Sequence, residues 1–258
     1  MKKILAVDLD GTLLTIDKTI RKEDLLALQR WKASGNLLAI NTGRPLSYYK
    51  QIKKLGVDYD IYIGGVGTVC LYQNGERETL FAFSQKTGEK IIDLLMKMEL
   101  DFVMVFDDDY SYCYNQNNRV NWGAIHKDVR NCYKDGKKDG NKFYVFCGEE
   151  EKAIRLTELI NSEYSNVAKA LQTETDQIEI VPKGADKWQG LLKGLSNAQI
   201  TYDGIYCIGD SNNDYDMIAN CTENFVMKNG VKKLLETADH IVGSVEEAVD
   251  ILLERQVD

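Results

Sequence analysis

Two aspartates stand two residues apart, directly after a short apolar run near the start of the chain. Asp8 and Asp10 follow the run 4–7, and Gly11 and Thr12 come next. An uninterrupted apolar run is typical of a strand that is buried on both faces of a parallel sheet. Alternate residues of a strand point the same way, so both carboxylates could face one crevice at the strand's carboxyl end. An ordinary Asp-Gly turn is the plain alternative for this motif taken alone.

Three later segments carry polar side chains where strands are expected to end or helices to begin. The residues are Thr42 and Gly43 after the run 37–40, Lys187 before the helical segment 188–195, and Asp210, Asn213 and Asp214 after the run 205–208. Seen singly, they could be helix caps or an exposed lysine. Carboxyl ends of parallel strands meet at one edge of a sheet, so we expect these segments to converge there.

The combined content of this edge predicts a particular chemistry. Several carboxylates near one point repel each other unless a cation lies between them, and oxygen ligands of this kind suit Mg²⁺. A lysine and a threonine beside such a cation supply donors for an anion. Carboxylate-bound Mg²⁺ together with these donors predicts phosphoryl transfer.

The elements that must position these residues alternate between strand and helix. We expect strands at 4–7, 37–40, 61–63, 205–208, 225–227 and 240–242, with helices between most of them. This alternation predicts an α/β fold with a doubly wound parallel sheet. Asn74 and Gly75, flanked by strand-like stretches, predict a β-hairpin.

The regular alternation of strand and helix is interrupted between residues 84 and 183. Strands are expected at 102–106, 110–114, 143–147, 167–171 and 177–181, with helices near 89–98 and 150–164. We predict an inserted α+β domain at 84–183, and a core domain made of residues 1–83 and 184–258. The two crossings, near Phe83 and at 182–184, are the expected hinges of a domain movement.

Composition limits the partners. The 258 residues carry a net charge of −8 with acids and bases mixed, so no basic stripe predicts binding to nucleic acid or to an anionic membrane. Six scattered cysteines without a C-x-x-C pair predict free thiols and a cytoplasmic location. We expect no signal peptide and no membrane span. The sequence does not determine the oligomeric state.

In order along the chain, four motifs resemble those of the haloacid dehalogenase-like phosphatases. They are Asp8-Leu9-Asp10-Gly11-Thr12, Thr42-Gly43-Arg44-Pro45, Lys187 after a glycine, and Gly209-Asp210-x-x-Asn213-Asp214. The insertion between the second and third motifs resembles that of the Cof-type group, subfamily IIB, whose members carry a large α/β cap domain.

This resemblance implies a role for each matching residue. Asp8 would be the nucleophile that forms an aspartyl-phosphate, and Asp10 the acid and then the base. Mg²⁺ would be held by Asp8, the backbone carbonyl of Asp10 and Asp210, with Asp214 in support. The phosphate-binding residues would be Thr12, Thr42, Gly43, Lys187 and Asn213.

Substrate selection is less constrained by the sequence. The candidates are Arg44 in the second motif and Arg119, Asn121, Trp122 and His126 in a long polar stretch, for which a solvated loop is the alternative. Gly64-Gly65-Val66 stands where these phosphatases commonly have Asn-Gly-Ala, so a side-chain amide is missing. A turn between strands is predicted at Asp107 to Asp109. One face of a strand is predicted for the alternating tyrosines Tyr110, Tyr112 and Tyr114.

The function expected from the motifs is a Mg²⁺-dependent phosphatase of small phosphorylated metabolites, with sugar phosphates as the favoured class. One alternative is a phosphotransferase or phosphomutase that uses the same aspartyl-phosphate. Another is a non-catalytic phospho-acceptor module. Asp10 and the insertion argue against the acceptor module, because it has no use for a leaving-group acid.

Overall fold

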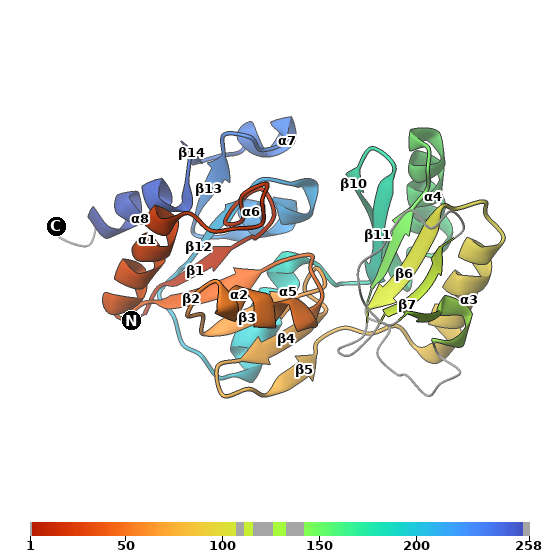
Figure 1. Ribbon diagram of the computed structural model, residues 1–258, viewed down its shortest axis with the longest axis horizontal. Coiled ribbons are helices and arrows are strands. Elements are labelled where there is room, and N and C mark those ends of the chain that lie inside the picture. Colours follow the sequence, from red (N-terminus) through yellow and green to blue (C-terminus); the bar gives the residue numbers. More distant parts are fainter. Residues whose placement is uncertain (1, 107–110, 116–125, 133–141, 255–258) are drawn as a thin grey trace. The chain divides into compact units, whose positions relative to one another are not determined.

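The structure is a computed structural model that describes residues 2–106, 111–115, 126–132 and 142–254. It divides into two compact units (Figure 1). The core unit comprises residues 1–44, 48–78 and 186–258, and the inserted unit comprises residues 45–47 and 79–185.

An eight-stranded sheet forms the centre of the core unit. Its order is β14 (His240–Val242), β13 (Glu223–Met227), β12 (Ile205–Gly209), β1 (Ile4–Val7), β2 (Leu37–Asn41), β3 (Ile61–Gly64), β4 (Val69–Tyr72) and β5 (Arg77–Thr79). The strands from β14 to β3 are parallel to their neighbours, whereas β4 is antiparallel to β3. Chain order reverses between β1 and β12, and such a switch point opens a crevice at the strands' carboxyl ends.

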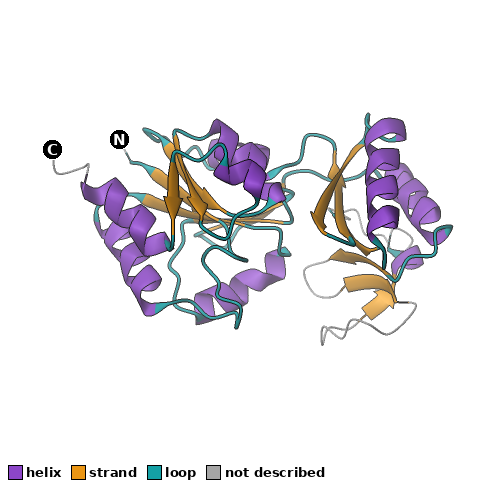
Figure 2. Ribbon diagram, turned by 90° about the horizontal axis from the view of Figure 1, so that it is seen from above, coloured by secondary structure: helices purple, strands orange, loops and turns teal. Residues whose placement is uncertain are grey.

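Helices cover both faces of this sheet (Figures 1 and 2). On one face α1 (Lys22–Ala33) packs against α8 (Val245–Glu254), and on the other α5 (Lys187–Asn197) packs against α6 (Tyr215–Asn220). The short helices α2 (Tyr49–Lys54) and α7 (Lys232–Leu235) complete the unit. A Cβ atom on Gly190 of α5 would lie 2.3 Å from the Cα of Gly67, so only glycine permits this close approach. The contact seats the first turn of α5 at the carboxyl edge of the sheet.

The inserted unit has its own sheet and core. The strand order is β10 (Ala168–Glu174), β11 (Gln177–Pro182), β9 (Phe143–Phe146), β6 (Phe102–Phe106), β7 (Ser111–Asn115) and β8 (His126–Asp128). All neighbours are antiparallel except β7 and β8. Side chains from α3 (Gln85–Met96) and α4 (Glu150–Glu163) form one apolar cluster with this sheet.

These two sheets confirm the predicted fold class. The core is a doubly wound α/β sheet, and the inserted segment combines helices with a mostly antiparallel sheet. Tyr112 is buried and Tyr114 packs against the same apolar cluster, as expected for one strand face, whereas Tyr110 and Asp107 to Asp109 lie outside the described residues. Helix α3 begins four residues before the expected start. The reason is a cap: the hydroxyl of Ser84 accepts a hydrogen bond from the backbone N–H of Thr87.

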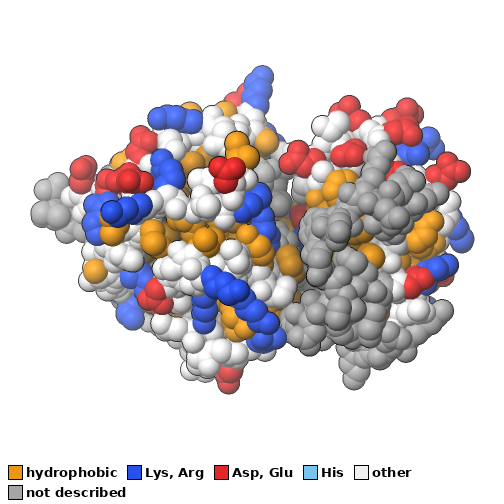
Figure 3. Space-filling view, in the orientation of Figure 1, with side chains coloured by type: hydrophobic (Ala, Val, Ile, Leu, Met, Phe, Trp, Pro, Cys, Tyr) orange, Lys and Arg blue, Asp and Glu red, His pale blue; other side chains and the backbone are white. Residues whose placement is uncertain are grey.

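The exposed surface agrees with the mixed charge pattern of the sequence. Figure 3 shows basic and acidic side chains interspersed on the face of the core unit that it presents. Within the described ranges, every helix is too short or too polar to cross a lipid bilayer.

Candidate active site

The carboxylate of Asp8 lies at the end of β1 and is 3% exposed. Nζ of Lys187, the first residue of α5, donates to Oδ1 of Asp8 and to Oδ1 of Asp214, at 2.6 Å each. Lys187 and Asp214 are fully buried. We call Asp8, Lys187, Asp210 and Asp214 the lysine cluster.

Burial and the neighbouring charges shift the pKa values of Asp8 and Lys187. It raises the pKa of Asp8 well above its usual value, and the negative charges of Asp214 and Asp210 raise it further, although the Lys187 ammonium opposes the shift. Burial alone would lower the pKa of Lys187, but Asp214 and Asp8 together raise it above its ordinary value. The lysine is therefore charged at neutral pH, and its single positive charge is shared by two carboxylates, those of Asp8 and Asp214.

The loop after β12 is shaped by Asp214. Its Oδ2 accepts hydrogen bonds from the backbone N–H groups of Asp210, at 3.0 Å, and Ser211, at 2.9 Å. A Cβ atom on Gly209 would lie 2.6 Å from Cγ of Asp214, so the loop requires glycine there. Both oxygens of Asp214 are thus engaged within the protein.

Asp210 faces the other acids from this loop. The hydroxyl of Thr12 donates to its Oδ1 at 2.7 Å. Gly11 has a φ of +84°, and a Cβ atom there would lie 2.3 Å from Oδ2 of Asp210, which explains the glycine of the first motif. Burial and the charge of Asp214 raise the pKa of Asp210 to about 6, and the Thr12 hydrogen bond opposes this shift.

The lysine cluster fits a divalent cation. Asp8, Asp210 and Asp214 each offer a carboxylate oxygen, and these oxygens lie within 4.8 Å of one another. Oxygen ligands suit Mg²⁺, and a cation would relieve the repulsion that raises the pKa values of Asp8 and Asp210. Because Asp214 already holds Lys187 and the loop, Asp8 and Asp210 are the better placed ligands.

Asp10 belongs to a separate set of contacts. Nε of Arg44 donates to its Oδ2 at 2.5 Å and Nη2 donates to its Oδ1 at 2.6 Å. Nζ of Lys18 donates to the same Oδ1 at 2.7 Å. The guanidinium of Arg44 lies 3.9 Å from the ring centroid of Tyr48. We call Asp10, Arg44, Lys18 and Tyr48 the arginine cluster.

The two cations reverse the effect of burial on Asp10. Burial raises the pKa of Asp10, but the hydrogen bonds and charges of Arg44 and Lys18 outweigh it and lower the pKa below its ordinary value. Sequence reasoning missed both Lys18 and Tyr48. Lys18 has a φ of +57°, a local backbone conformation that the residue type does not predict.

Two side chains at the end of β2 contact the backbone of Arg44 and of Lys187, one residue from each cluster. The hydroxyl of Thr42 accepts the backbone N–H of Arg44 at 3.1 Å, and Gly43 lies between them. Nδ2 of Asn41 donates to the backbone carbonyl of Lys187 at 2.9 Å. Asn41 was not predicted as a site residue, although it ties β2 to the start of α5.

Asn213 lies on the loop after β12, where its Oδ1 accepts a hydrogen bond from the hydroxyl of Ser211 at 3.0 Å. The structure thus brings all the motif residues to the carboxyl edge of one sheet.

The predicted selectivity residues Arg119, Asn121 and Trp122 lie outside the described residues, and His126 starts β8 but its side chain is not described.

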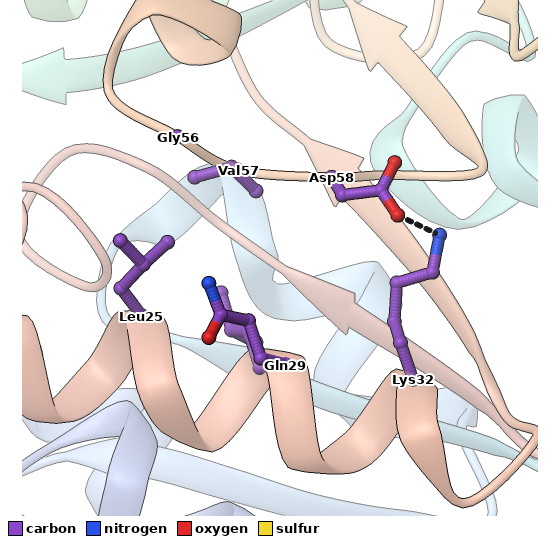
Figure 4. A pocket seen from close by; sticks show the side chains of 7 residues that line it. Leu25, Gln29, Lys32, Gly56, Val57 and Asp58 are labelled. Atoms are coloured by element: carbon purple, nitrogen blue, oxygen red, sulfur yellow. Dashed lines mark ion pairs between the residues drawn. The ribbon is translucent and has the colours of Figure 1, made fainter.

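A small pocket of about 130 Å³ lies elsewhere in the core unit (Figure 4). It is formed by α1 and the loop before β3, and Lys32 pairs there with Asp58 at 3.0 Å. This loop leads into the amino end of β3, so the pocket is at the opposite edge of the sheet from Asp8. It is not part of the candidate active site.

Comparison with known proteins gives phosphatases as relatives. The chain is 28% identical to 5-amino-6-(5-phospho-D-ribitylamino)uracil phosphatase YwtE of Bacillus subtilis. The alignment, gaps included, is 278 residues long and covers 95% of this chain and 94% of that protein. It is 25% identical over 252 residues to HMP-PP phosphatase of Escherichia fergusonii, covering 93% and 89%.

Solved structures share the fold. A haloacid dehalogenase-like hydrolase from Bacteroides thetaiotaomicron superposes with a TM-score of 0.82 at 20% identity, covering 98% of this chain and all of that one. A subclass IIB sugar phosphatase superposes with a TM-score of 0.79 at 18% identity, covering both chains in full. At the level of the fold, these neighbours agree with the Cof-type resemblance.

The family model for haloacid dehalogenase-like hydrolases matches residues 5–250, almost the whole chain. The match and the named relatives confirm the predictions of the family and of the enzyme class, a phosphoric monoester hydrolase. The chain belongs to the haloacid dehalogenase-like hydrolases.

Proposed function

We propose that this hydrolase removes the phosphoryl group from small phosphorylated metabolites, sugar phosphates foremost, through an aspartyl-phosphate on Asp8 and with Mg²⁺ bound. The observation that carries the proposal is that Asp8, Asp210 and the buried Lys187 meet at one strand end. Without metal or substrate, the pKa of Asp8 is raised and that of Asp10 is lowered. Bound Mg²⁺ would lower the pKa of Asp8, and a phosphoryl dianion beside Asp10 would raise the pKa of Asp10, which suits a nucleophile and a proton donor.

In the proposed reaction an oxygen of Asp8 attacks phosphorus, and the bond from phosphorus to the leaving oxygen breaks. Asp10 protonates the leaving oxygen and later takes a proton from the water that hydrolyses the aspartyl-phosphate. Lys187 and the donors of Thr12, Thr42, Gly43 and Asn213 are the candidates to bind the phosphoryl oxygens. Mg²⁺, when held by Asp8, Asp210 and the Asp10 carbonyl with Asp214 in support, would neutralise charge on the phosphoryl group.

The substrate class is inferred from the relatives and from the charge of the site. The two curated relatives act, by their names, on a phosphorylated ribityl compound and on HMP-PP, and a fold neighbour is a sugar phosphatase. All are small phosphorylated molecules, and a chain with a net charge of −8 is a poor partner for nucleic acid.

The test is phosphate release from a panel of sugar phosphates, other phosphorylated metabolites and nucleotides, with Mg²⁺ and with EDTA. Asp8→Asn is compared with Asp17→Asn, the same change at an exposed aspartate of the β1–α1 connection. We expect metal-dependent release that Asp17→Asn keeps and Asp8→Asn loses. Release that survives Asp8→Asn would contradict the proposal. Phosphate transfer to an added alcohol instead of water would favour the phosphotransferase alternative.

We also infer action in a reducing compartment, the cytoplasm, because all six cysteines are free thiols. Fractionation of the host cell with detection of the native protein tests this location. Recovery with an oxidising compartment would contradict it.

A further inference from the structure

We propose that Arg44 is a positioning residue for the leaving-group acid Asp10, and that it does not select the substrate. This inference rests on the proposed function and deepens it. It assigns to the second motif a task beyond phosphate binding, which is to fix the plane of a carboxylate contributed by the first motif.

The contact between Arg44 and Asp10 is made at two points. Nε and Nη2 of the guanidinium donate to different oxygens of the carboxylate, at 2.5 and 2.6 Å. A planar fork of this kind fixes both the direction and the rotation of a carboxylate. Lys18 contacts a single oxygen, so its ammonium contributes charge without fixing the plane.

Arg44 is itself held on several sides. Its backbone N–H donates to the hydroxyl of Thr42 at 3.1 Å, and its carbonyl accepts the N–H of Gly65 at 2.8 Å. The ring of Tyr48 stacks on its guanidinium at 3.9 Å. Its side chain is 24% exposed, compared with 53% for Lys18. A side chain fixed at the backbone and at its head group is a suitable support for a catalytic neighbour.

The need for a well-aligned Asp10 depends on the leaving group of the substrate. An alkyl alcohol leaves as a neutral molecule only if an acid protonates its oxygen, whereas p-nitrophenol leaves as a stable anion. The alignment of Asp10 therefore matters for an alkyl phosphate and much less for p-nitrophenyl phosphate. The parameter to compare is kcat/KM, because it reports the steps up to departure of the leaving group when that departure is irreversible.

The experiment measures kcat/KM of Arg44→Lys and Arg44→Met with both substrates, the alkyl phosphate being the best one of the panel. We expect losses of about 10²-fold or more on the alkyl phosphate and less than about tenfold on p-nitrophenyl phosphate. Arg44→Lys is expected to fail as well, since it keeps the charge and loses the fork. Activity on p-nitrophenyl phosphate shows that each variant is folded.

Lys18→Met is the companion variant, because it removes the other cation from the same carboxylate and leaves the fork intact. We expect it to lose less on the alkyl phosphate than either Arg44 variant does, since an exposed ion pair at a single oxygen is weak. In the Asp10→Asn background, Arg44→Met should cost nothing more on the alkyl phosphate, because the group it positions is gone.

Equal losses on both substrates in the Arg44 variants would overturn the inference, as would an additive loss in the double variant or a changed ranking of the panel. Failure of the proposed function has a different signature. In that case the wild type releases no phosphate, or release survives Asp8→Asn.

Discussion

The lysine cluster and the arginine cluster begin two residues apart on one strand, and they treat their carboxylates in opposite ways. Asp8 and Asp10 each touch a cation, at 2.6 Å and at 2.5 to 2.7 Å. Yet the pKa of Asp8 is raised and that of Asp10 is lowered. Lys187 contacts two buried acids, Asp8 and Asp214, and Asp210 lies beside them, whereas Asp10 alone is paired with Arg44 and Lys18. Burial and the ratio of acids to cations, rather than contact with a cation, set the direction of each shift.

The largest expected effect comes from removing the shared cation of the lysine cluster. Lys187→Met leaves Asp8 and Asp214 buried without a counter-charge, which we expect to cost about 3–5 kcal/mol of stability in the metal-free protein. Turnover should fall by about 10²–10³-fold or more, because a donor to the phosphoryl oxygens is lost. Urea unfolding and steady-state kinetics check both effects. Lys193→Met, at an exposed position of the same helix, is the control.

The stability of Lys187→Met should also depend on pH in a defined direction. Without the lysine, the pKa of Asp8 should rise further above its usual value, so Asp8 takes up a proton on folding. The loss relative to wild type therefore shrinks as pH falls and grows as pH rises. A loss that is the same at every pH, or no loss at all, would mean that Lys187 does not balance these acids.

A smaller effect is expected for metal binding as a function of pH. Mg²⁺ needs Asp210 ionised, and the pKa of this group is about 6. Protonation of Asp210 should lower the affinity by about tenfold for each pH unit below 6, and protonation of Asp8, whose pKa is also raised, should make the fall steeper. Titration calorimetry of the substrate-free protein with Mg²⁺ measures this dependence. An Mg²⁺ affinity that stays constant from about pH 5 to about pH 7 would exclude Asp210 as a ligand.

The smallest effect is expected at Thr12. Its hydroxyl donates to Asp210 and opposes the rise in the pKa of that carboxyl. Thr12→Val removes the donor, so the pKa of Asp210 should rise and the loss of Mg²⁺ affinity should begin at a higher pH. At neutral pH the change should be only a few-fold, since a single hydrogen bond contributes about 1 kcal/mol. The same calorimetric titration measures it, with Thr15→Val, on the same connection, as the control. A shift to lower pH would contradict the assignment.

Much of the core unit is predictable from local sequence. The four residues of β1 are all fully buried, as their unbroken apolar run predicts. Gly11 has a left-handed backbone, as expected for the glycine of an Asp-Gly pair at a strand end. The motif residues therefore meet where parallel strands end, which the alternation of strands and helices already indicates.

The contacts that distinguish the two clusters are not predictable in this way. The arginine fork joins residues 34 positions apart, and the bond from Asn41 to the Lys187 carbonyl joins residues 146 apart. Lys18 reaches Asp10 from a backbone conformation that its residue type rarely adopts. The sequence names Arg44 as a candidate for substrate selection, but it does not show that the guanidinium contacts Asp10.

In the proposed reaction Asp8 carries the phosphoryl group and Asp10 serves both halves of the reaction. The direct test is rapid acid quench of Asp10→Asn with p-nitrophenyl phosphate, followed by mass spectrometry of the peptide that contains Asp8. We expect a phosphoryl group to accumulate on Asp8, because its formation needs no acid with this leaving group and its hydrolysis has lost the base. Adding Asp8→Asn should abolish the adduct. Release of p-nitrophenol with no phosphoryl group on Asp8 at any quench time, or with a phosphoryl group on another residue, would rule out Asp8 as the nucleophile.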